Sequence, residues 1–354
     1  MVIQEFGLVQ FRNYQDLFVE FSNRINFFIG RNGQGKTNLA EGIYYLAHLS
    51  SFRTRRLGEL LRSGAPRGYI QGAVTRDDFP LKARIELSRQ GRRVWLDEEA
   101  IARTSRYISE FYVFLFNPER LYGYRQQPAE RRALFNRYLA FIDAGYLNTV
   151  KGYRVVLAQK NRLLKNGEKS SLPDWNKLFV QKSYDIILER AESVSAINQH
   201  LAGIFHQLTG RQERLRLVYL PSLRGDAAEG ARVLERVAER ERLVGHALYG
   251  PHRDDFRLEF AGSGSEELFS QGEYRAAWLA LQMAMSRLMT ERMRFRPVWI
   301  LDDLFSELDQ GVCGRVLDVL AAGTNQVFIT TTELPRHLRL PEGRIMEIES
   351  GRVA

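Results

Sequence analysis

The chain has 354 residues, of which 44% are hydrophobic and 26% are charged, as in ordinary soluble globular proteins of one or two domains. Its 51 Lys and Arg residues exceed its 42 Asp and Glu residues, and the net charge of +9 favours a polyanionic partner such as nucleic acid. A single cysteine, Cys313, excludes an intramolecular disulfide framework, and the lack of a leader-like segment or an apolar run of about 20 residues predicts a cytoplasmic protein without a membrane-spanning helix.

Residues 1–120 are predicted to form a sheet-rich lobe of a nucleotide-binding domain. The first 25 residues alternate apolar and polar side chains, as in an antiparallel strand pair that turns near Asn13. An apolar run at 25–29 predicts a buried strand, and residues 38–46 have helical spacing. Further strand-like runs occur at 68–75, 81–87, 93–96 and 111–116.

Between the buried strand and the helix lies a phosphate loop, residues 30–37, that fits the pattern G-x-x-x-x-G-K-[ST]. Lys36 is expected to reach the β- and γ-phosphates of a nucleotide, and the Thr37 hydroxyl is expected to bind Mg²⁺. Glycines allow the backbone to approach the phosphates closely, and the helix N-terminus adds partial positive charge there. The residues predicted to bind ATP in this segment are Gly30, Arg31, Asn32, Gly33, Gln34, Gly35, Lys36, Thr37 and Asn38.

Residues 121–235 are predicted to form a helical arm inserted into the nucleotide-binding domain. From Pro128 to about Leu220 the apolar spacing is almost wholly helical. Asp174 is the predicted cap of a long helix that stops at Gly210. The chain then returns to complete the domain.

Residues 236–354 are predicted to supply the other lobe, giving an α/β fold. Two buried strands of the parallel type are predicted at 297–301 and 326–330, with a helix at 311–320 between them. Asp302 and Asp303 follow the first of these strands, where phosphate-loop NTPases place the acid that completes the Mg²⁺ shell. Asp302 suits that role, and Asp303 is positioned to orient the attacking water. Paired aspartates also commonly just end a strand, so this pair alone does not decide between the two interpretations.

A second helix N-terminus is predicted at residues 270–273, here called the signature segment. Ser270 and Glu273 have capping-box spacing ahead of a helix at 274–289, which is a purely structural interpretation. The functional interpretation uses the same geometry, since a helix N-terminus with a serine hydroxyl and a glycine binds phosphate. One triphosphate does not need two such sites in one chain, but two chains that face each other do. Ser270, Gln271, Gly272 and Glu273 of one chain are therefore predicted to complete the ATP site of another.

The chain resembles the ABC-type ATPase heads of structural-maintenance-of-chromosomes proteins in the order of its motifs. These are the phosphate loop, the signature segment, the strand that ends in two aspartates and the segment 306–309. Further segments narrow the resemblance to the RecF family of bacterial recombination mediators, and together they span nearly the whole chain. These segments are 11–14, 32–38, 51–54, 128–132, 250–255, 270–272 and 326–331.

The resemblance implies an ABC-type ATPase domain with an inserted helical arm, ATP with Mg²⁺ as ligands, an ATP-dependent homodimer, double-stranded DNA bound without sequence preference, and partners of the RecO and RecR type. It also adds Asp309 and Thr331 to the ATP site. Departures from the family's pattern are Glu273 in place of the more usual Gln, and Ala40 and Gly42 where bulkier or better helix-forming residues are commoner. In comparison with transporters, Thr331 or a neighbour occupies the place of their histidine, and Asp303 replaces their longer Glu. The last two predict slow ATP turnover.

Two basic segments are predicted DNA contacts. The first is rich in arginine, with Glu59 as its single acid, and the second lies in the arm. For any one of these residues a solvated charge is the simpler interpretation, but as a group they fit a clamp that two protomers close over a duplex. The residues are Arg53, Arg55, Arg56, Arg62, Lys160 and Arg162. Since no recognition helix or zinc-finger spacing occurs, binding is expected to be sequence-independent and sensitive to salt.

The leading functional prediction is an ATP-dependent DNA-binding protein of recombinational repair, which assists recombinase loading at gaps or stalled forks and uses slow ATP hydrolysis as a switch. The alternative, an ATPase subunit of an ABC-type membrane transporter, is disfavoured by the missing histidine, the basic charge and the helical insertion. A GTPase or small-molecule kinase is disfavoured because the guanine-specifying N-K-x-D pattern is absent and the signature serine would have no role.

Overall fold

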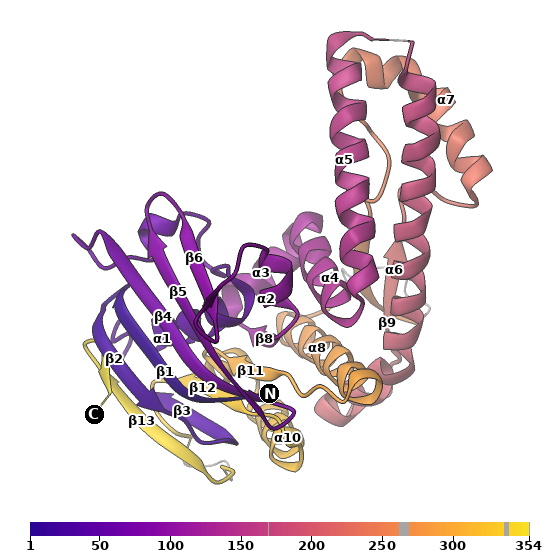
Figure 1. Cartoon of the computed structure of the whole chain (residues 1–354). Helices are drawn as coiled ribbons and strands as arrows, with labels where there is room; N and C mark the ends of the chain where they lie inside the picture. Colours follow the sequence, from indigo (N-terminus) through magenta and orange to yellow (C-terminus); the bar gives the residue numbers. More distant parts are fainter. Residues whose placement is uncertain (169, 262–268, 336–339, 354) are drawn as a thin grey trace. The chain divides into compact units, whose positions relative to one another are not determined.

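The computed structural model describes residues 1–168, 170–261, 269–335 and 340–353, and the chain divides into two compact units (Figure 1). Unit 1 comprises Met1–Gly123, Ile204–Gln212 and Phe269–Ala354, and unit 2 comprises Tyr124–Gly203 and Glu213–Leu268. The boundary predicted at residue 235 is wrong, because it falls inside helix α7 (Ala227–Val244) and unit 2 continues beyond that helix.

A mostly parallel sheet forms the base of unit 1, in the strand order β14-β13-β3-β12-β11-β8. The pairing is parallel from β8 through β11, β12 and β3 to β13, and β14 pairs antiparallel with β13 at the edge. All residues of β8 and β11 are buried, which explains why these strands are continuous apolar runs without alternation. The bounds are β3 Ile25–Ile29, β8 Val113–Phe116, β11 Val298–Leu301, β12 Val327–Thr331, β13 Gly343–Glu349 and β14 Arg352–Val353. The two strands predicted near 297–301 and 326–330 are confirmed.

An antiparallel sheet in the order β2-β1-β4-β5-β6-β7 forms the other layer of unit 1. In β4 and β5 every second residue is buried over most of the strand, as in a sheet with one face packed on a core and the other meeting water. The turn predicted near Asn13 is confirmed, since Phe11 pairs with Tyr14. The bounds are β1 Val2–Phe11, β2 Tyr14–Glu20, β4 Arg67–Arg76, β5 Phe79–Ser88, β6 Arg92–Leu96 and β7 Glu99–Ala100.

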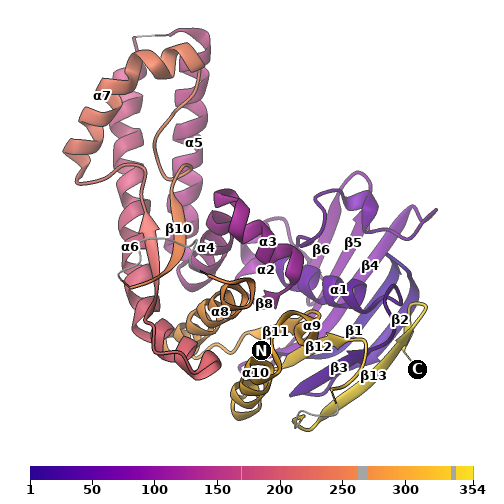
Figure 2. The same ribbon diagram turned by 180° about the vertical axis from the view of Figure 1, so that it is seen from behind.

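Helix α1 (Lys36–His48) lies between the two sheets of unit 1 and contacts both of them (Figure 2). Gly42 makes the close packing possible, because a Cβ atom there would lie 2.9 Å from the Leu8 side chain. The other helices of unit 1 are η1 Leu57–Glu59, α2 Thr104–Ile108, α8 Gln271–Met293, α9 Leu304–Glu307 and α10 Gln310–Ala322, and α3 Pro118–Gln126 crosses the boundary between the units.

Unit 2 is built on two long antiparallel helices, α5 (Ala144–Asn166) and α6 (Leu172–Thr209), which run side by side in both views (Figures 1 and 2). The last residues of α6 belong to unit 1. Helix α7 packs on α5, and α4 (Pro128–Ile142) packs on α5 and on β10. Asp174 lies inside the first turn of α6 instead of capping it, whereas the stop predicted at Gly210 is confirmed.

The predicted helical stretch is wrong at its end, because residues Leu215–Leu220 form strand β9, which pairs antiparallel with β10 (Asp255–Phe260). Leu215 and Leu217 are buried while Arg216 between them is exposed, so this segment has the period of a strand. Among the described residues, no helix has the length and apolarity needed to cross a membrane.

Candidate functional site

The phosphate loop connects the end of β3 to the start of α1 in unit 1. Gly35 has a φ of 118°, and a Cβ atom there would lie 2.6 Å from the Asn13 amide nitrogen, so the position requires glycine. The Lys36 ammonium is folded over the loop, where it donates to the carbonyl oxygens of Gly30 at 2.7 Å and Arg31 at 3.1 Å. Burial lowers the pKa of Lys36, and Asp303 and Asp302 oppose that shift.

The loop is braced from outside by residues of the β1–β2 turn. The Asn13 amide donates to the carbonyl oxygen of Gln34 at 2.9 Å, and the Tyr14 hydroxyl donates to the carbonyl oxygen of Gly35 at 3.0 Å. The backbone N–H of Gly351, after β13, also donates to the Gln34 carbonyl at 2.9 Å. The sequence predicts a turn near Asn13 and the segment 11–14 supports the family resemblance, but neither pattern assigns this segment a role in the site.

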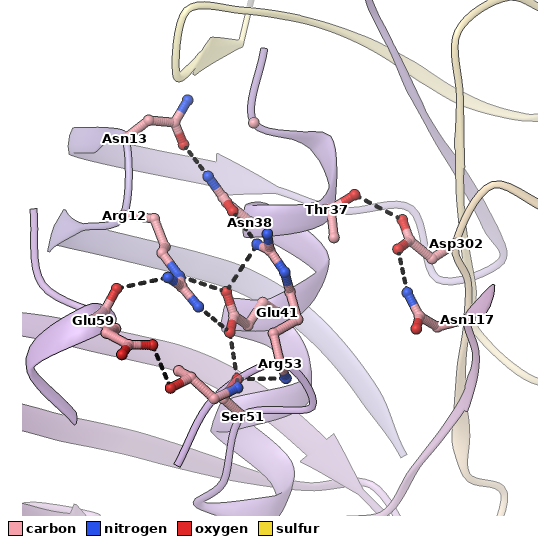
Figure 3. Close-up of polar contacts among 12 residues, drawn as sticks. Arg12, Asn13, Thr37, Asn38, Glu41, Ser51, Arg53, Glu59, Asn117 and Asp302 are labelled. Atoms are coloured by element: carbon pink, nitrogen blue, oxygen red, sulfur yellow. Dashed lines mark hydrogen bonds and ion pairs between the residues drawn. The ribbon is translucent and has the colours of Figure 1, made fainter. Parts of the chain in front are cut away.

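The predicted metal ligands meet although 265 positions separate them in the chain. The Thr37 hydroxyl donates to Asp302 Oδ1 at 3.2 Å, and Asp302 is only 1% exposed (Figure 3). The Asn117 amide donates to Asp302 Oδ2 at 2.8 Å, and the Thr330 hydroxyl donates to Oδ1 at 2.6 Å. A hydroxyl and a carboxylate are hard oxygen ligands of the kind that Mg²⁺ prefers, so the pair fits the predicted metal.

Asn117 and Thr330 hold the predicted metal ligand Asp302, and the sequence analysis assigns neither of them a role. A signal existed, because they stand at the carboxyl ends of β8 and β12, the two neighbours of β11. Polar residues at the carboxyl ends of adjacent parallel strands gather at one edge of the sheet, where ligands of open α/β sheets bind. Together they hold the Asp302 carboxylate in one orientation.

Asp303 lies beside this pair with a left-handed backbone, φ 53°, and its N–H donates to the Thr330 hydroxyl at 3.0 Å. Burial and the neighbouring Asp302 raise the pKa of Asp303, against the opposing effect of Lys36. Asp303 borders an open depression of about 690 Å³, which Asn32 and Thr331 also line. The Thr331 hydroxyl donates to the Glu333 carbonyl at 2.7 Å. Asp309 caps α10, accepting from the N–H of Val312 at 2.9 Å, so its predicted ATP contact stays a prediction.

The signature segment has the capping box that its spacing predicts. The N–H of Glu273 donates to the Ser270 hydroxyl oxygen at 3.2 Å, and the N–H of Ser270 donates to the Glu273 carboxylate at 2.7 Å. Arg211, which follows the end of α6 and belongs to unit 1, forms an ion pair with Glu273 that offsets its negative charge. Ser270, Gln271 and Gly272 are exposed, and the first N–H groups of a helix have no acceptors within it. The helix start is therefore both capped and open to a ligand.

A buried carboxylate connects the phosphate-loop helix to the arginine-rich segment. Glu41 is fully buried and accepts two hydrogen bonds from Arg12, at 2.7 Å each, and one from the Ser51 hydroxyl (Figure 3). Arg53 lies 3.7 Å from the same carboxylate and donates to the Asn38 side-chain oxygen at 2.8 Å. A predicted DNA contact is thus bonded directly to a residue of the predicted ATP site.

The other predicted DNA contacts divide by exposure. Arg55, Arg56 and Arg162 are exposed, and the partly buried Arg62 donates to Gln15 at 2.8 Å. Lys160 is a wrong prediction, because it is fully buried in unit 2.

The ammonium group of Lys160 lies 2.8 Å from the Glu241 carboxylate and 4.6 Å from the centre of the Phe179 ring. Lys160 and Arg162 are two residues apart on α5, so about 200° of helical rotation places them on opposite faces. The positive charge of the two residues in the sequence does not indicate which of them faces the core and which faces solvent.

The chain matches the family model described as the RecF/RecN/SMC N terminal domain over residues 2–338. It is 33% identical to the DNA replication and repair protein RecF of Geotalea daltonii, with 98% of this chain and 100% of that protein aligned. It is 32% identical to the protein of the same name from Bacillus cytotoxicus, with 100% of this chain and 98% of that protein aligned.

Among solved structures, the chain resembles the recombination mediator protein RecF with ATP, in the RecFOR pathway, at a TM-score of 0.90 and 25% identity over 100% of this chain and 97% of that one. The Smc head bound to the C-winged helix domain of ScpA matches at a TM-score of 0.58 and 16% identity, over 100% of this chain and 96% of that one. The second match shows a shared fold.

Proposed function

Because this chain belongs to the RecF family of DNA replication and repair proteins, within the RecF/RecN/SMC group, we propose that it is an ATP-gated DNA-binding protein of recombinational repair. ATP joins two copies face to face, the dimer closes over duplex DNA, and slow hydrolysis reopens it. The observation that carries this proposal is the signature segment, a helix N-terminus that is exposed, capped and charge-balanced in the same unit as the phosphate loop.

ATP is the proposed nucleotide, since the RecF structure that is similar over this whole chain is described with ATP. Lys36 exchanges its bonds to the loop carbonyls for the β- and γ-phosphates, and Thr37 and Asp302 hold Mg²⁺. The metal supplies charge neutralisation on the phosphates. Asp303 accepts a hydrogen bond from the attacking water. Its raised pKa and short side chain support slow turnover.

The second half of the ATP site comes from another copy of the chain. Ser270 and the N–H groups that follow it offer hydrogen-bond donors to a γ-phosphate, and the helix dipole adds to their attraction. Glu273 would oppose a phosphate, but Arg211 offsets its charge. The exposed surface of Gly272, where a Cβ atom would meet nothing within 4 Å, supports close approach of a partner.

The DNA contacts proposed for unit 1 are the arginines of the segment after α1, and Arg162 is proposed for unit 2. Arg53 is bonded to Asn38, so movement of the phosphate loop on binding ATP reaches this segment through one hydrogen bond. RecO- and RecR-type mediators are proposed partners, since the similar RecF structure is assigned to the RecFOR pathway, and recombinase loading at gaps or stalled forks is the proposed outcome. No observation favours the transporter, GTPase or kinase alternatives.

The test is light scattering after size exclusion, without nucleotide, with ADP and with ATP. We expect a dimer only with ATP, and a monomer at micromolar concentration in all three conditions would refute the composite site. Ser270→Arg should abolish the dimer, while Ser195→Arg, which adds the same charge at an exposed serine on α6, should not. Lys36→Met should remove the ATP-dependent part of DNA binding and leave the ATP-independent part.

A further inference from the structure

Two segments that support the family resemblance, 128–132 and 250–255, take no part in the nucleotide site, yet they meet inside unit 2. Arg131 donates to both carboxylate oxygens of Asp255, at 2.8 Å each. Its neighbour Arg132 donates to the backbone carbonyl oxygen of Asp254 at 2.7 Å. These contacts fix the start of α4 against the start of β10, so the two segments form one cluster.

Other groups in unit 2 already use the two carboxylates of this cluster. Asp254 is fully buried and accepts from Arg190 at 2.8 Å, from the Tyr219 hydroxyl and from the backbone N–H of Ser222 at 2.8 Å. Asp255 accepts from Arg131, as described, and from Arg257 at 3.1 Å. Among the residues that the structure describes, Asp254 pairs with Arg190 and Asp255 pairs with Arg131 and Arg257, whereas neither carboxylate forms an ion pair with Arg132 or Arg253.

The cluster therefore carries surplus positive charge. Five guanidinium groups face the two carboxylates of Asp254 and Asp255, which leaves a surplus of three positive charges. They belong to Arg131, Arg132, Arg190, Arg253 and Arg257.

Arg257 shares the Asp255 carboxylate with Arg131, and two further guanidinium groups, those of Arg132 and Arg253, form no ion pair with a residue the structure describes. Arg132 is half-buried, and its neighbour Arg253 is exposed, with a side chain that forms no hydrogen bond or ion pair with any residue the structure describes. Burial and the guanidinium groups of Arg190 and Arg253 lower the pKa of Arg132 below its usual value, although the Asp255 and Asp254 carboxylates oppose this shift. Like charges gathered in a partly buried place are unfavourable without an anion, which implies an anionic ligand.

The backbone around Arg253 is held in place. The Arg253 N–H donates to the Gly250 carbonyl at 2.8 Å, and Ser222 exchanges hydrogen bonds with the N–H and carbonyl of Gly250 at 2.7 and 2.9 Å. His252 bonds to the Tyr153 hydroxyl at 2.6 Å, and burial lowers its pKa to about 4, so at neutral pH it adds no charge. The turn thus presents Arg253 at a fixed place beside Arg132.

We propose that Arg132 and Arg253 bind phosphate groups of a DNA backbone, which gives unit 2 a DNA contact that the predicted Lys160 does not provide. The planar guanidinium fork matches the oxygens of a phosphate, and a nucleic acid offers such anions in series. A contact of this kind carries no sequence information, in agreement with sequence-independent binding. The proposal rests on the proposed DNA-binding function and names residues that perform it.

The test is fluorescence anisotropy with labelled duplex DNA of mixed sequence, in the presence of ATP, over a series of salt concentrations. The logarithm of the association constant K falls with the logarithm of the salt concentration, and each lost phosphate contact makes this negative slope less steep by about 0.9. At about 0.1 M salt this corresponds to roughly eightfold weaker binding. We expect this change for Arg253→Gln. The matched control is Arg216→Gln, which removes the same charge from the neighbouring strand β9, where Arg216 is paired with Glu259, and it should leave the slope unchanged.

The double variant Arg132→Gln with Arg253→Gln should make the slope less steep by about 1.8. Because Arg132 is half-buried, Arg253→Gln alone decides the matter if the double variant fails to fold. Binding by Arg253→Gln with the slope and affinity of the unaltered protein would overturn the proposal, as would an equal loss in Arg216→Gln. ATP-dependent dimerisation and DNA binding of the unaltered protein separate a failure of the phosphate site from a failure of the proposed function. If the unaltered protein dimerises and binds DNA but Arg253→Gln binds equally well, only the phosphate site is refuted. If the unaltered protein binds no DNA, the proposed function fails as well.

Discussion

Replacing Lys160 by methionine tests the buried ion pair that overturned a predicted DNA contact. The Lys160 ammonium lies 2.8 Å from the Glu241 carboxylate, and the two side chains are 0% and 2% exposed. Methionine has similar length and volume but no charge. The Glu241 carboxylate would then stay buried, with the N–H of Leu248 at 2.9 Å still donating to it.

The expected loss of unfolding free energy follows from that geometry. Removing one partner of a buried ion pair costs about 3–5 kcal/mol, because the other charge is left uncompensated. The remaining hydrogen bond from Leu248 places the expected cost near the lower end, at about 3 kcal/mol. At roughly 2–4 °C per kcal/mol for a unit of this size, the melting temperature should fall by roughly 6–12 °C. Adding Glu241→Leu should restore most of the loss, since apolar replacement of a buried pair is often neutral or better.

Scanning calorimetry measures the melting temperature, and the salt slope of DNA binding serves as the second readout. The control Arg162→Met alters an exposed residue two positions away and should change stability by less than about 0.5 kcal/mol. Lys160→Met should lose stability and keep the salt slope. A variant with unchanged melting temperature and a slope lower by about 0.9 would refute the reasoning, because Lys160 would then be solvated and bound to DNA.

Three further predictions concern unit 1 and the cluster in unit 2. Glu41→Gln should destabilise the protein by about 2 kcal/mol in urea denaturation, because Arg12 loses a buried carboxylate, and it should weaken ATP-dependent DNA binding by releasing Arg53. Asp303→Asn should abolish phosphate release while light scattering still detects the ATP-dependent dimer; phosphate release at the unaltered rate would remove Asp303 from the reaction. The pKa of His252 is lowered to about 4 by burial, so between pH 6.5 and 4 the unfolded chain binds the extra proton. Unfolding free energy should therefore fall by at most about 3 kcal/mol as pH drops through that window, and a flat profile would contradict the burial.

Local patterns were enough to predict the elements that carry the nucleotide site. The strand at 25–29, the glycine-rich loop and the helix after it follow from apolar spacing and the backbone needs of glycine, which act over a few residues. The capping box at Ser270 is equally local, since both of its hydrogen bonds span three residues. In contrast, strand β9 lies in a stretch whose apolar spacing predicts a helix, because the strand that pairs with it, β10, lies about 40 residues further on.

The amino-acid sequence by itself determined that the chain is an α/β nucleotide-binding protein of a recognisable family, because short-range periodicity and ordered motifs depend only on neighbouring residues. Tertiary structure alone decided which side chains meet. It brought Asn117 and Thr330 to Asp302, joined Arg53 to Asn38, and turned Lys160 inward while Arg162 stayed exposed. The physical reason is that burial and hydrogen-bond partnership are set by strand order and helix rotation across long sequence separations. Charge and spacing along the chain do not contain that information.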